Sequence, residues 1–328
     1  MIQLSVAIGD YDRNRPLIDG HARIDGVDPI IMTLTPEEMF FRAMRHEAFD
    51  ICELSLSSHT LRTSRGDAPY VAIPAFVSRA FRHTGIIVRS DSGITEPAQL
   101  KGRRVGIPEW QLTANVWIRA LLQDQYGVDP QDIKWVRGGL EQPGRVEKVK
   151  LDLPEGVEIE EIAPADTLRD MLADGRIDAF MGPRAPTSFV PSNTALRWIF
   201  NDPTAEAMAY YDKTKIFPIM HVIGIRKTLA EQHPWLPMAV YKAFVQSKQL
   251  AIEHLSETSA TKITLPFVEE QLRRAVSLMG QDFWPYGIGP NRHVLEYFTA
   301  AHHKQGLSKR QVAIEELFHP STLENYVI

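Results

Sequence analysis

Three scarcities limit what this 328-residue sequence can encode: one cysteine, no long apolar run and no excess of positive charge. Cys52 has no second cysteine to pair with, and its apolar setting in FDICELSL favours a buried hydrophobic residue over a nucleophile. No apolar run reaches the ~18 residues that argue for a membrane span. The formal charge of −5, without a separate Lys/Arg cluster, argues against nucleic acid as a partner.

An export signal is also missing from the start of the sequence. Met1 leads directly into an apolar strand-like run, with no basic segment and no apolar stretch before a small-residue cleavage site. A single cysteine fits a reducing compartment. We therefore expect a cytoplasmic protein that does not bind membranes.

The common templates for cofactors and hydrolases are absent too. There is no His-Glu-x-x-His, no cysteine pair, no Walker-type loop and no Gly-x-Ser-x-Gly. His302 and His303 are adjacent on a predicted helix and so point to different sides. Gly287-Ile-Gly289 does not lie between a strand and a helix, as a dinucleotide fingerprint would. These observations predict no cofactor and no resident metal.

What the sequence does contain is an alternation of short apolar runs and helical patterns, which is typical of βαβ units on a mostly parallel sheet. Thr35-Pro36-Glu37-Glu38 reads as a capping box that opens a helix to about His46. After Arg226 the patterns are mainly helical, at residues 234–254, 265–279, 290–305 and 308–317. The expected strands are residues 4–9, 28–34, 50–56, 70–76, 84–89, 104–108, 133–138, 178–183, 196–200 and 220–226.

A weak internal symmetry organises these elements. In each half a strand ends in a polar loop, and a later helix leads into an Asp-initiated apolar strand. We expect an α/β fold of two Rossmann-like lobes with mixed sheets, joined by two crossing strands that act as a hinge, with a ligand cleft between the lobes. The expected lobes are residues 1–87 with 222–328, and residues 88–221.

The carboxyl ends of the strands are the predicted position of the site, because open α/β sheets bind ligands there. Arg79 and Arg82 favour an anion site, since two arginines and a histidine in an apolar stretch fit a solvated face poorly. Simpler structural roles stay open, such as an Asx turn at Asp10 and a satisfied core position for His221. The full set is Asp10, Tyr11, Asp12, Arg13, Ser55, Ser57, Ser58, Phe76, Arg79, Arg82, His83, Glu109, Trp110, Gln111, Thr113, Pro183, Arg184, Phe217 and His221.

Several stretches together resemble 4,5-dihydroxyphthalate decarboxylases, enzymes similar in fold to type II periplasmic binding proteins. The stretches are SRAFRHTGIIVR, GRRVGIPEWQLTANVWIRALLQDQYGV, KIFPIMHVIGIR and PWLPMAVYKAF, and the likeness runs from about residue 50 to ELFHPSTL near the end. The resemblance implies cofactor-independent decarboxylation of a hydroxylated aromatic dicarboxylate, giving protocatechuate and CO2 from 4,5-dihydroxyphthalate. The partner it implies is thus a small aromatic carboxylate.

Roles for the residues follow from that implied chemistry. Arg79 and Arg82 would bind a carboxylate, helped by the amides of the helix after Gln111. Either His83 or His221 would donate the proton. Glu109 and Asp10 would engage the hydroxyls, and Trp110 is expected to be free to face the ring. The ring walls would be Phe217, Trp110 and Tyr11, with Ser55, Gln111, Thr113 and Arg184 completing the substrate contacts.

The sequence is also compatible with two other functions. A non-catalytic solute-binding protein for an aromatic or other carboxylate would use the same fold, but it predicts an export signal or a lipidated cysteine near the start. A biosynthetic enzyme on this fold, such as one of thiamine-pyrimidine or menaquinone synthesis, is a third interpretation. The sequence also leaves open a divalent ion at Asp10 and Asp12 or at Glu109, and assembly into a homo-oligomer.

Overall fold

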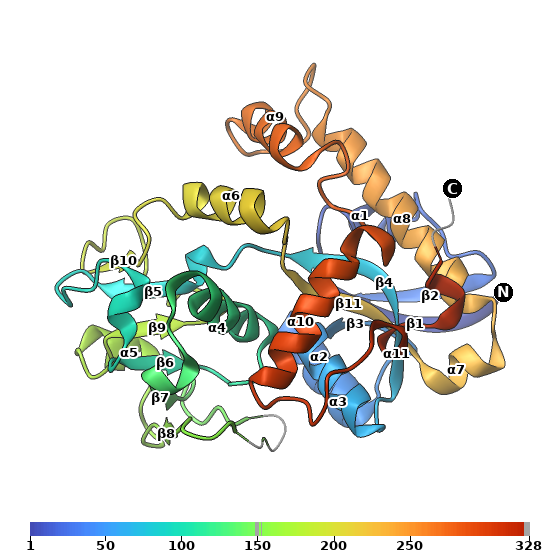
Figure 1. The fold of residues 1–328 in the computed structure, drawn as a ribbon. Coiled ribbons are helices and arrows are strands. Elements are labelled where there is room, and N and C mark those ends of the chain that lie inside the picture. Colours follow the sequence, from blue (N-terminus) through green and yellow to red (C-terminus); the bar gives the residue numbers. More distant parts are fainter. Residues whose placement is uncertain (148–150, 152, 325–328) are drawn as a thin grey trace. The chain divides into compact units, whose positions relative to one another are not determined.

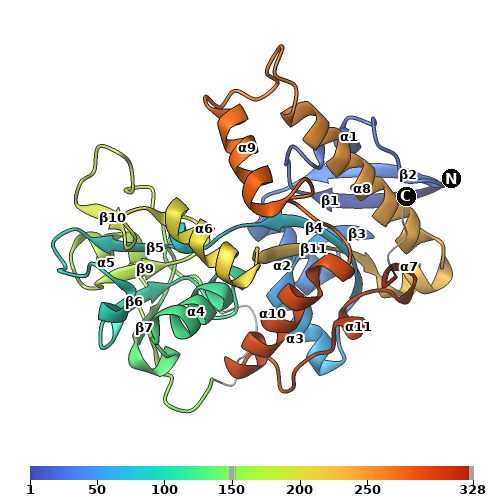
Figure 2. The same cartoon turned by 45° about the horizontal axis from the view of Figure 1, so that its top comes forward.

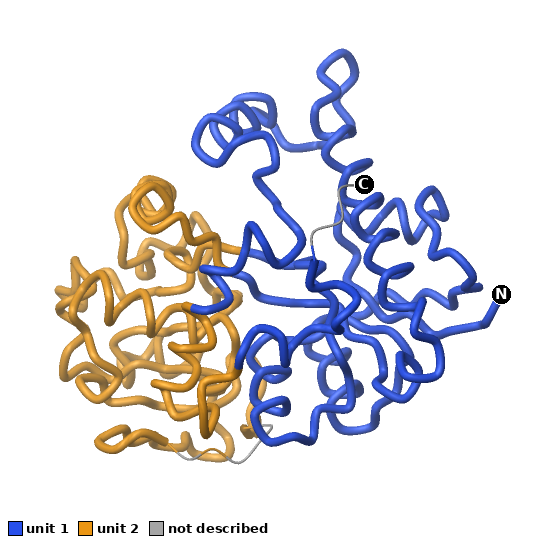
Figure 3. The backbone as a smooth tube through the Cα atoms, turned by 45° about the vertical axis from the view of Figure 1, so that its right-hand side comes forward, with its two compact units in different colours: residues 1–79, 219–296, 313–328 blue, residues 80–218, 297–312 orange. Residues whose placement is uncertain are grey.

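The computed structural model describes residues 1–147, 151 and 153–324, and the chain divides into two compact units (Figures 1 and 3). Unit 1 comprises residues 1–79, 219–296 and 313–328, and unit 2 comprises residues 80–218 and 297–312. The unit boundaries therefore fall after residues 79 and 218, whereas the sequence suggested 87 and 221. Residues 297–312, expected in the first lobe, belong to unit 2. The shift places His221 in unit 1.

The sheet of unit 1 has five strands in the order β2-β1-β3-β11-β4. Strands β1, β2 and β3 are parallel, and β11 runs antiparallel to both β3 and β4. The buried run ICELS of β3 is the continuous apolar type expected of a strand covered on both faces, except for its glutamate. The strands are β1 (Ile2–Ile8), β2 (Val27–Thr33), β3 (Ile51–Ser55), β4 (Tyr70–Arg79) and β11 (Ile219–Arg226).

Helices cover both faces of this sheet. In Figures 1 and 2, α2 and α3 lie on one side of the strands, and α1 and α8 lie on the other. Glycine follows α3 at a positive φ, the usual way to end a helix (Gly66, φ 76°). The helices are α1 (Arg15–Ile18), α2 (Pro36–His46), α3 (Leu56–Arg65), α7 (Lys227–Gln232), α8 (Leu236–Leu255), α9 (Val268–Met279) and α11 (Ile314–Leu317).

Unit 2 is built on a six-stranded sheet in the order β10-β5-β9-β6-β7-β8. Its core packs α5 (Leu168–Ala173) against the sheet through Leu168, Met171 and Leu172. The strands are β5 (Ile86–Arg89), β6 (Arg104–Ile107), β7 (Lys134–Arg137), β8 (Ile159–Glu161), β9 (Ala179–Met181) and β10 (Leu196–Trp198), and the other helices are α4 (Thr113–Tyr126) and α6 (Pro203–Thr214). Helix α10 (Arg292–Lys304) begins in unit 1 and ends in unit 2.

The two sheets repeat one arrangement, which confirms the α/β class with two mixed sheets. The run β2-β1-β3-β11 of unit 1 has the same order and directions as β7-β6-β9-β5 of unit 2. In each run, three parallel strands are followed by one antiparallel strand from a distant part of the sequence. The loops after β1 and β6 are therefore equivalent positions at the carboxyl edges of their sheets.

Some details differ from the sequence-based prediction. Strand β8 was not expected, and of the helix predicted at residues 308–317 only α11 forms. Thr35 precedes α2, but its side chain accepts no capping hydrogen bond, so the predicted capping box is wrong. None of the helices in the described ranges combines the length and the apolar character needed to cross a membrane.

Candidate active site

A buried carboxylate in unit 1 gathers three hydrogen-bond donors. Glu53 lies in β3 with none of its surface exposed. Its Oε2 accepts from the Gly9 amide at 3.0 Å, and its Oε1 accepts from the Tyr11 hydroxyl at 2.9 Å. The Nδ1 of His221 lies 2.5 Å from the same Oε1. A buried carboxylate requires such partners, because leaving it without them would cost several kcal/mol.

The strand pairing explains why Glu53 and His221 meet. Strands β3 and β11 are antiparallel, with Ser55 opposite His221 and Glu53 opposite Ile223. Residues two apart on a strand point to the same face, so Glu53 and His221 are diagonal neighbours on one face of the sheet. On its other side, β11 pairs with β4 through register shifts around His221. Such irregularities redirect a side chain at a sheet edge.

The bond to Glu53 fixes the orientation of the His221 ring. With Nδ1 turned toward the carboxylate, Nε2 is the nitrogen left for another molecule, and the side chain is 16% exposed. Phe40 packs edge-on against the imidazole, with the ring centroids 4.8 Å apart. A carboxylate behind a histidine holds the ring in one tautomer and one orientation. The pair is therefore equipped to deliver a proton through Nε2.

Tyr11 closes one side of this cluster, and a glycine makes its position possible. A Cβ at Gly9 would lie 2.5 Å from the Tyr11 ring, so only glycine lets the ring approach the chain here. Burial, followed by the charge of Glu53, raises the pKa of Tyr11. The phenol therefore stays protonated at neutral pH and acts as a donor.

Arg13 brings a positive charge to the same edge of the sheet. Its guanidinium carbon lies 4.4 Å from the ring centroid of Tyr11 and 4.4 Å from that of Trp284. Its Nε donates to the Val77 carbonyl, and its Nη1 pairs with Asp12 at 3.0 Å. This stacking between two rings fixes the plane of the guanidinium, the form in which arginine best recognises carboxylates.

The remaining predicted residues of unit 1 have diverse surroundings. Asp10 is exposed and pairs with Arg15 at 3.0 Å. Ser55 is buried and its hydroxyl accepts from the Ser58 amide, at 3.4 Å, at the start of α3. Arg79 is buried, and its Nη1 donates to the Asn291 side chain at 2.8 Å and to the Pro285 carbonyl at 3.1 Å. The last two bonds anchor the chain around residues 285–291 to the end of β4.

In unit 2, His83 lies in an aromatic cage. Its ring is near Phe81, Phe200 and Tyr210, at centroid distances of 6.5, 5.3 and 5.6 Å, and neither ring nitrogen has a hydrogen-bond partner among the described residues. Burial lowers the pKa of His83 to about 4, so the ring is neutral at pH 7. Phe217, another predicted site residue, stacks on Phe81 with the centroids 4.7 Å apart.

The two predicted arginines of unit 2 differ in exposure. Arg82 is half-buried and donates from Nη1 to the Pro183 carbonyl at 3.3 Å. Burial lowers the pKa of Arg82 to about 10, which leaves its charge intact at neutral pH. Arg184 is exposed.

The junction between β6 and α4 is buried rather than open. Glu109 is fully buried, and the Nη2 of Arg145 lies 2.6 Å from its Oε1. Gln111 and Thr113 are buried beside it. Trp110 packs edge-on against Trp135 at 5.3 Å and donates from Nε1 to the Gln305 carbonyl at 3.2 Å. The expectation that Trp110 is free to face a ligand is therefore wrong, because the interior of unit 2 already covers its ring.

Two buried histidines predict loss of stability in mild acid. Burial lowers the pKa of both His59 and His83 to about 4, below the ~6.5 of an unfolded chain. The folded state favours the neutral ring at both positions. The contribution of the two histidines to the free energy of unfolding is therefore complete above pH 6.5 and is lost as the pH falls toward 4. Between pH 7 and pH 5 we expect the free energy of unfolding to fall by about 2 kcal/mol for each histidine.

Urea denaturation at the two pH values measures this loss. Phe suits the aromatic cage of His83, so a His83→Phe variant should lose less stability than the parent over the same range. Equal pH dependence in the two proteins would contradict the assignment.

Glu53 is not among the residues predicted from the sequence, although one signal points to it. A glutamate inside the otherwise apolar run DICELSL is unfavourable in a buried strand unless hydrogen-bond donors elsewhere in the fold bind its carboxylate. Arg137 and Glu147 were not predicted either, and Glu147 contacts both Arg137 and the β6–α4 junction. Within the residues that the structure covers, no three His, Cys, Asp or Glu side chains gather as a metal site would require.

Comparison with known proteins gives consistent matches. The family model "NMT1/THI5 like" matches residues 42–148. The chain is 56% identical to a 4,5-dihydroxyphthalate decarboxylase of Comamonas testosteroni over 327 residues, covering 100% of this chain and 99% of the relative. A second relative of that name, from Pseudomonas putida, is 51% identical over 210 residues, covering 64% of this chain and 81% of the relative.

Solved structures match in fold. The periplasmic aliphatic sulphonate binding protein SsuA from Escherichia coli aligns with a TM-score of 0.54 at 16% identity, covering 100% of this chain and 96% of that one. At this identity the likeness shows the fold alone.

Proposed function

Because the chain belongs to the 4,5-dihydroxyphthalate decarboxylase family, we propose that it removes one carboxyl group of 4,5-dihydroxyphthalate as CO2 and leaves 3,4-dihydroxybenzoate. The match across the whole chain supports the substrate class. The structural observation that carries the proposal is the Glu53–His221 pair, a proton-delivering arrangement at the carboxyl edge of the unit 1 sheet.

The chemistry calls for a proton donor at one ring carbon. Direct loss of CO2 from an aromatic ring would leave a carbanion in an sp² orbital, without delocalisation. In this substrate each carboxylate has a hydroxyl para to it. When that hydroxyl loses its proton, the carbon bearing the leaving carboxylate can accept one and become tetrahedral. The C–C bond then breaks, CO2 departs, and its bonding electrons restore the aromatic ring as a phenolate. Reprotonation of the phenolate completes the reaction, with one proton consumed overall.

His221 suits the donor role better than His83. Glu53 binds Nδ1 of His221, which leaves Nε2 as the ring nitrogen for a substrate. His83 is neutral at pH 7 and is enclosed by aromatic rings. We therefore assign the proton to Nε2 of His221.

Tyr11 and Arg13 extend this assignment to substrate binding. Tyr11 holds Glu53 by its hydroxyl and carries the Arg13 guanidinium on its ring face. Nε and Nη1 of Arg13 are bound to Val77 and Asp12, so Nη2 is the nitrogen that we propose for a substrate carboxylate. Arg82 remains a proposed substrate contact, whereas the Nη1 of Arg79 holds the chain around Asn291.

The need for a para hydroxyl gives a direct test with substrate analogues. We expect 4,5-dihydroxyphthalate to release CO2, and phthalate, which has no hydroxyl, to bind without releasing any. In D2O the product should carry one deuterium, at the carbon that lost CO2. CO2 release and mass spectrometry of the product measure both outcomes. CO2 release from phthalate would contradict the mechanism, and tight binding of 4,5-dihydroxyphthalate without turnover would favour a solute-binding protein.

The proposal includes a cytoplasmic location. The single cysteine, Cys52, is buried and free, which suits a reducing compartment. Fractionation of the source cells would contradict this part of the proposal by finding the protein outside the cytoplasm.

A further inference from the structure

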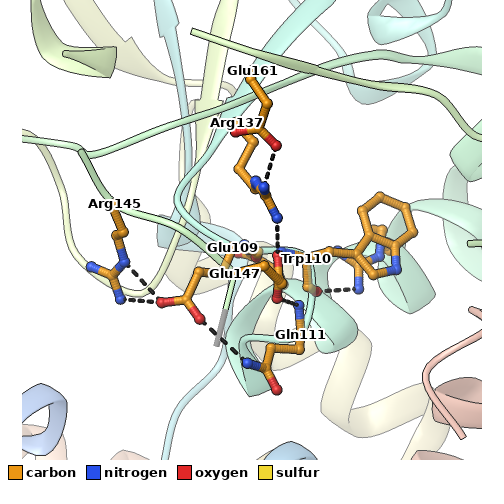
Figure 4. Close-up of polar contacts among 9 residues, drawn as sticks. Glu109, Trp110, Gln111, Arg137, Arg145, Glu147 and Glu161 are labelled. Carbon is orange, nitrogen blue, oxygen red and sulfur yellow. Dashed lines mark hydrogen bonds and ion pairs between the residues drawn. The ribbon is translucent and has the colours of Figure 1, made fainter. Parts of the chain in front are cut away.

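Two consecutive backbone amides after β6 bind a carboxylate of the chain itself. The Trp110 amide donates to Oε2 of Glu147 at 2.8 Å, and the Gln111 amide donates to Oε1 at 3.0 Å. Each carboxylate oxygen therefore receives one amide. Figure 4 shows Glu147 held between these amides and Arg137, whose Nη1 donates to Oε2 at 3.0 Å. This is a complete receptor for one carboxylate group.

Buried donors on α4 strengthen both amides. The peptide that supplies the Trp110 N–H has the Glu109 carbonyl at its other end, which accepts from Nδ2 of Asn115 at 2.8 Å. The next peptide supplies the Gln111 N–H, and its Trp110 carbonyl accepts from Nη2 of Arg119 at 2.8 Å. A donor on the carbonyl of a peptide polarises it and makes its N–H a better donor. Both peptides are thus prepared for negative charge.

Arg119 adds a charge that no carboxylate of the described residues contacts directly. It is 2% exposed, its guanidinium carbon lies 3.7 Å from the Trp110 ring centroid, and its Nη1 has no partner among the described residues. Its Nε donates to the Gln305 side chain at 2.8 Å. A buried arginine without a touching counter-ion is costly unless a negative charge is held nearby. Glu147, across the Trp110–Gln111 peptide, supplies that charge.

The nearby Glu109 does not compete for the receptor, because Arg145 holds it. Nε and Nη2 of Arg145 lie 2.8 and 2.6 Å from Oε1 of Glu109. Arg145 and Glu147 are two residues apart in the segment that follows β7. Arg145 and Glu147 therefore occupy the Glu109 carboxylate and the Trp110 and Gln111 amides, respectively.

We propose that the Trp110 and Gln111 amides, with Arg137, form the receptor for one substrate carboxylate, and that Glu147 occupies it until substrate displaces it. The identity of that substrate rests on the proposed function, while the receptor itself rests on the contacts above. An aromatic dicarboxylate keeps one carboxylate through the reaction, and this retained group needs a fixed partner. Glu147 then acts as an internal competitor, and the apparent affinity for substrate is reduced by the fraction of molecules in which it is bound.

The test compares Glu147→Gln with Glu161→Gln, using phthalate as a probe that the proposed mechanism cannot decarboxylate. Glutamine cannot accept from both amides, because one end of its amide group carries hydrogens. Glu161 is a matched control, since it also contacts Arg137 and loses the same charge on substitution. Calorimetry should show phthalate binding roughly tenfold tighter to Glu147→Gln than to the parent, with Glu161→Gln close to the parent. Hydrogen exchange at the Trp110 and Gln111 amides should be faster in Glu147→Gln and slow again with phthalate.

Unchanged or weaker phthalate binding by Glu147→Gln would overturn the proposal and leave Glu147 as a brace of the junction. Absence of binding to parent and variant alike would overturn it as well. If Glu147→Gln does not fold, Glu147→Asp replaces it, because the shorter acid keeps the charge but reaches the amides poorly and should still tighten binding. The CO2 assay with 4,5-dihydroxyphthalate judges the decarboxylase function separately, since phthalate binding requires no turnover.

Discussion

Replacing His221 with glutamine is expected to lower kcat for 4,5-dihydroxyphthalate by ~10²–10⁴-fold and to change KM little, the effect of removing a general acid. Glutamine retains a polar group near Glu53 but cannot release a proton near neutral pH. Its amide group can still donate to the buried Glu53, so the variant should remain folded. Steady-state rates of CO2 release, with circular dichroism as a check on folding, measure the effect.

The control for this variant is His254→Gln, at an exposed position in the last turn of α8. It removes a histidine without touching the cluster, and its kcat should match the parent. An unchanged kcat in His221→Gln would remove His221 from the donor role. A large loss in a well-folded His83→Phe variant, with His221→Gln active, would transfer that role to His83.

Glu53→Gln should have a comparable effect on the rate, ~10²–10⁴-fold in kcat, together with a loss of about 1–3 kcal/mol in stability. The carboxylate accepts from Gly9, Tyr11 and His221, and glutamine offers only one oxygen for the two positions. Either the Gly9 amide or the Nδ1–H of His221 would then face an N–H group. The imidazole would lose the carboxylate that fixes its tautomer and its orientation.

Tyr11→Phe is the matched control for Glu53→Gln. It removes one donor from the same carboxylate and leaves the pair with His221 intact, so we expect a loss in kcat of about tenfold or less. Steady-state rates and thermal denaturation of the two variants distinguish an effect of the Glu53 charge on kcat from a general loss of packing. Retention of kcat within about threefold by a folded Glu53→Gln protein would contradict the role of the pair.

The sequence predicted what depends on local pattern. Apolar runs predicted the strands other than β8, and the repeated order of strand, helix and Asp-initiated strand indicated two similar units. It also proposed His221 and Tyr11 as site residues from their places near strand ends, and both contact Glu53 in the structure. These features are encoded within a few residues of where they act.

What the sequence could not give were contacts between distant residues. Glu53 lies 42 residues from Tyr11 and 168 from His221, so no spacing reveals the cluster. Trp110 was expected to be free because the segment PEWQ alone does not show that Trp135 and Gln305 will cover its ring. Glu147 likewise reaches the junction across 37 residues, through a segment whose composition resembles that of an ordinary loop.

The separation of Glu53 and His221 along the chain has a consequence for synthesis. Strand β3 can pair with β1 once both have left the ribosome, but its other edge stays unpaired until β11 is made. At 5–20 residues per second, the 168 intervening residues take roughly ten to thirty seconds to be made. Unit 2 is largely encoded within that interval, so it can fold first. During this interval Glu53 lacks its histidine partner, and one edge of β3 is unpaired. An unpaired strand edge favours aggregation, so we expect chaperones to bind the nascent chain in this interval.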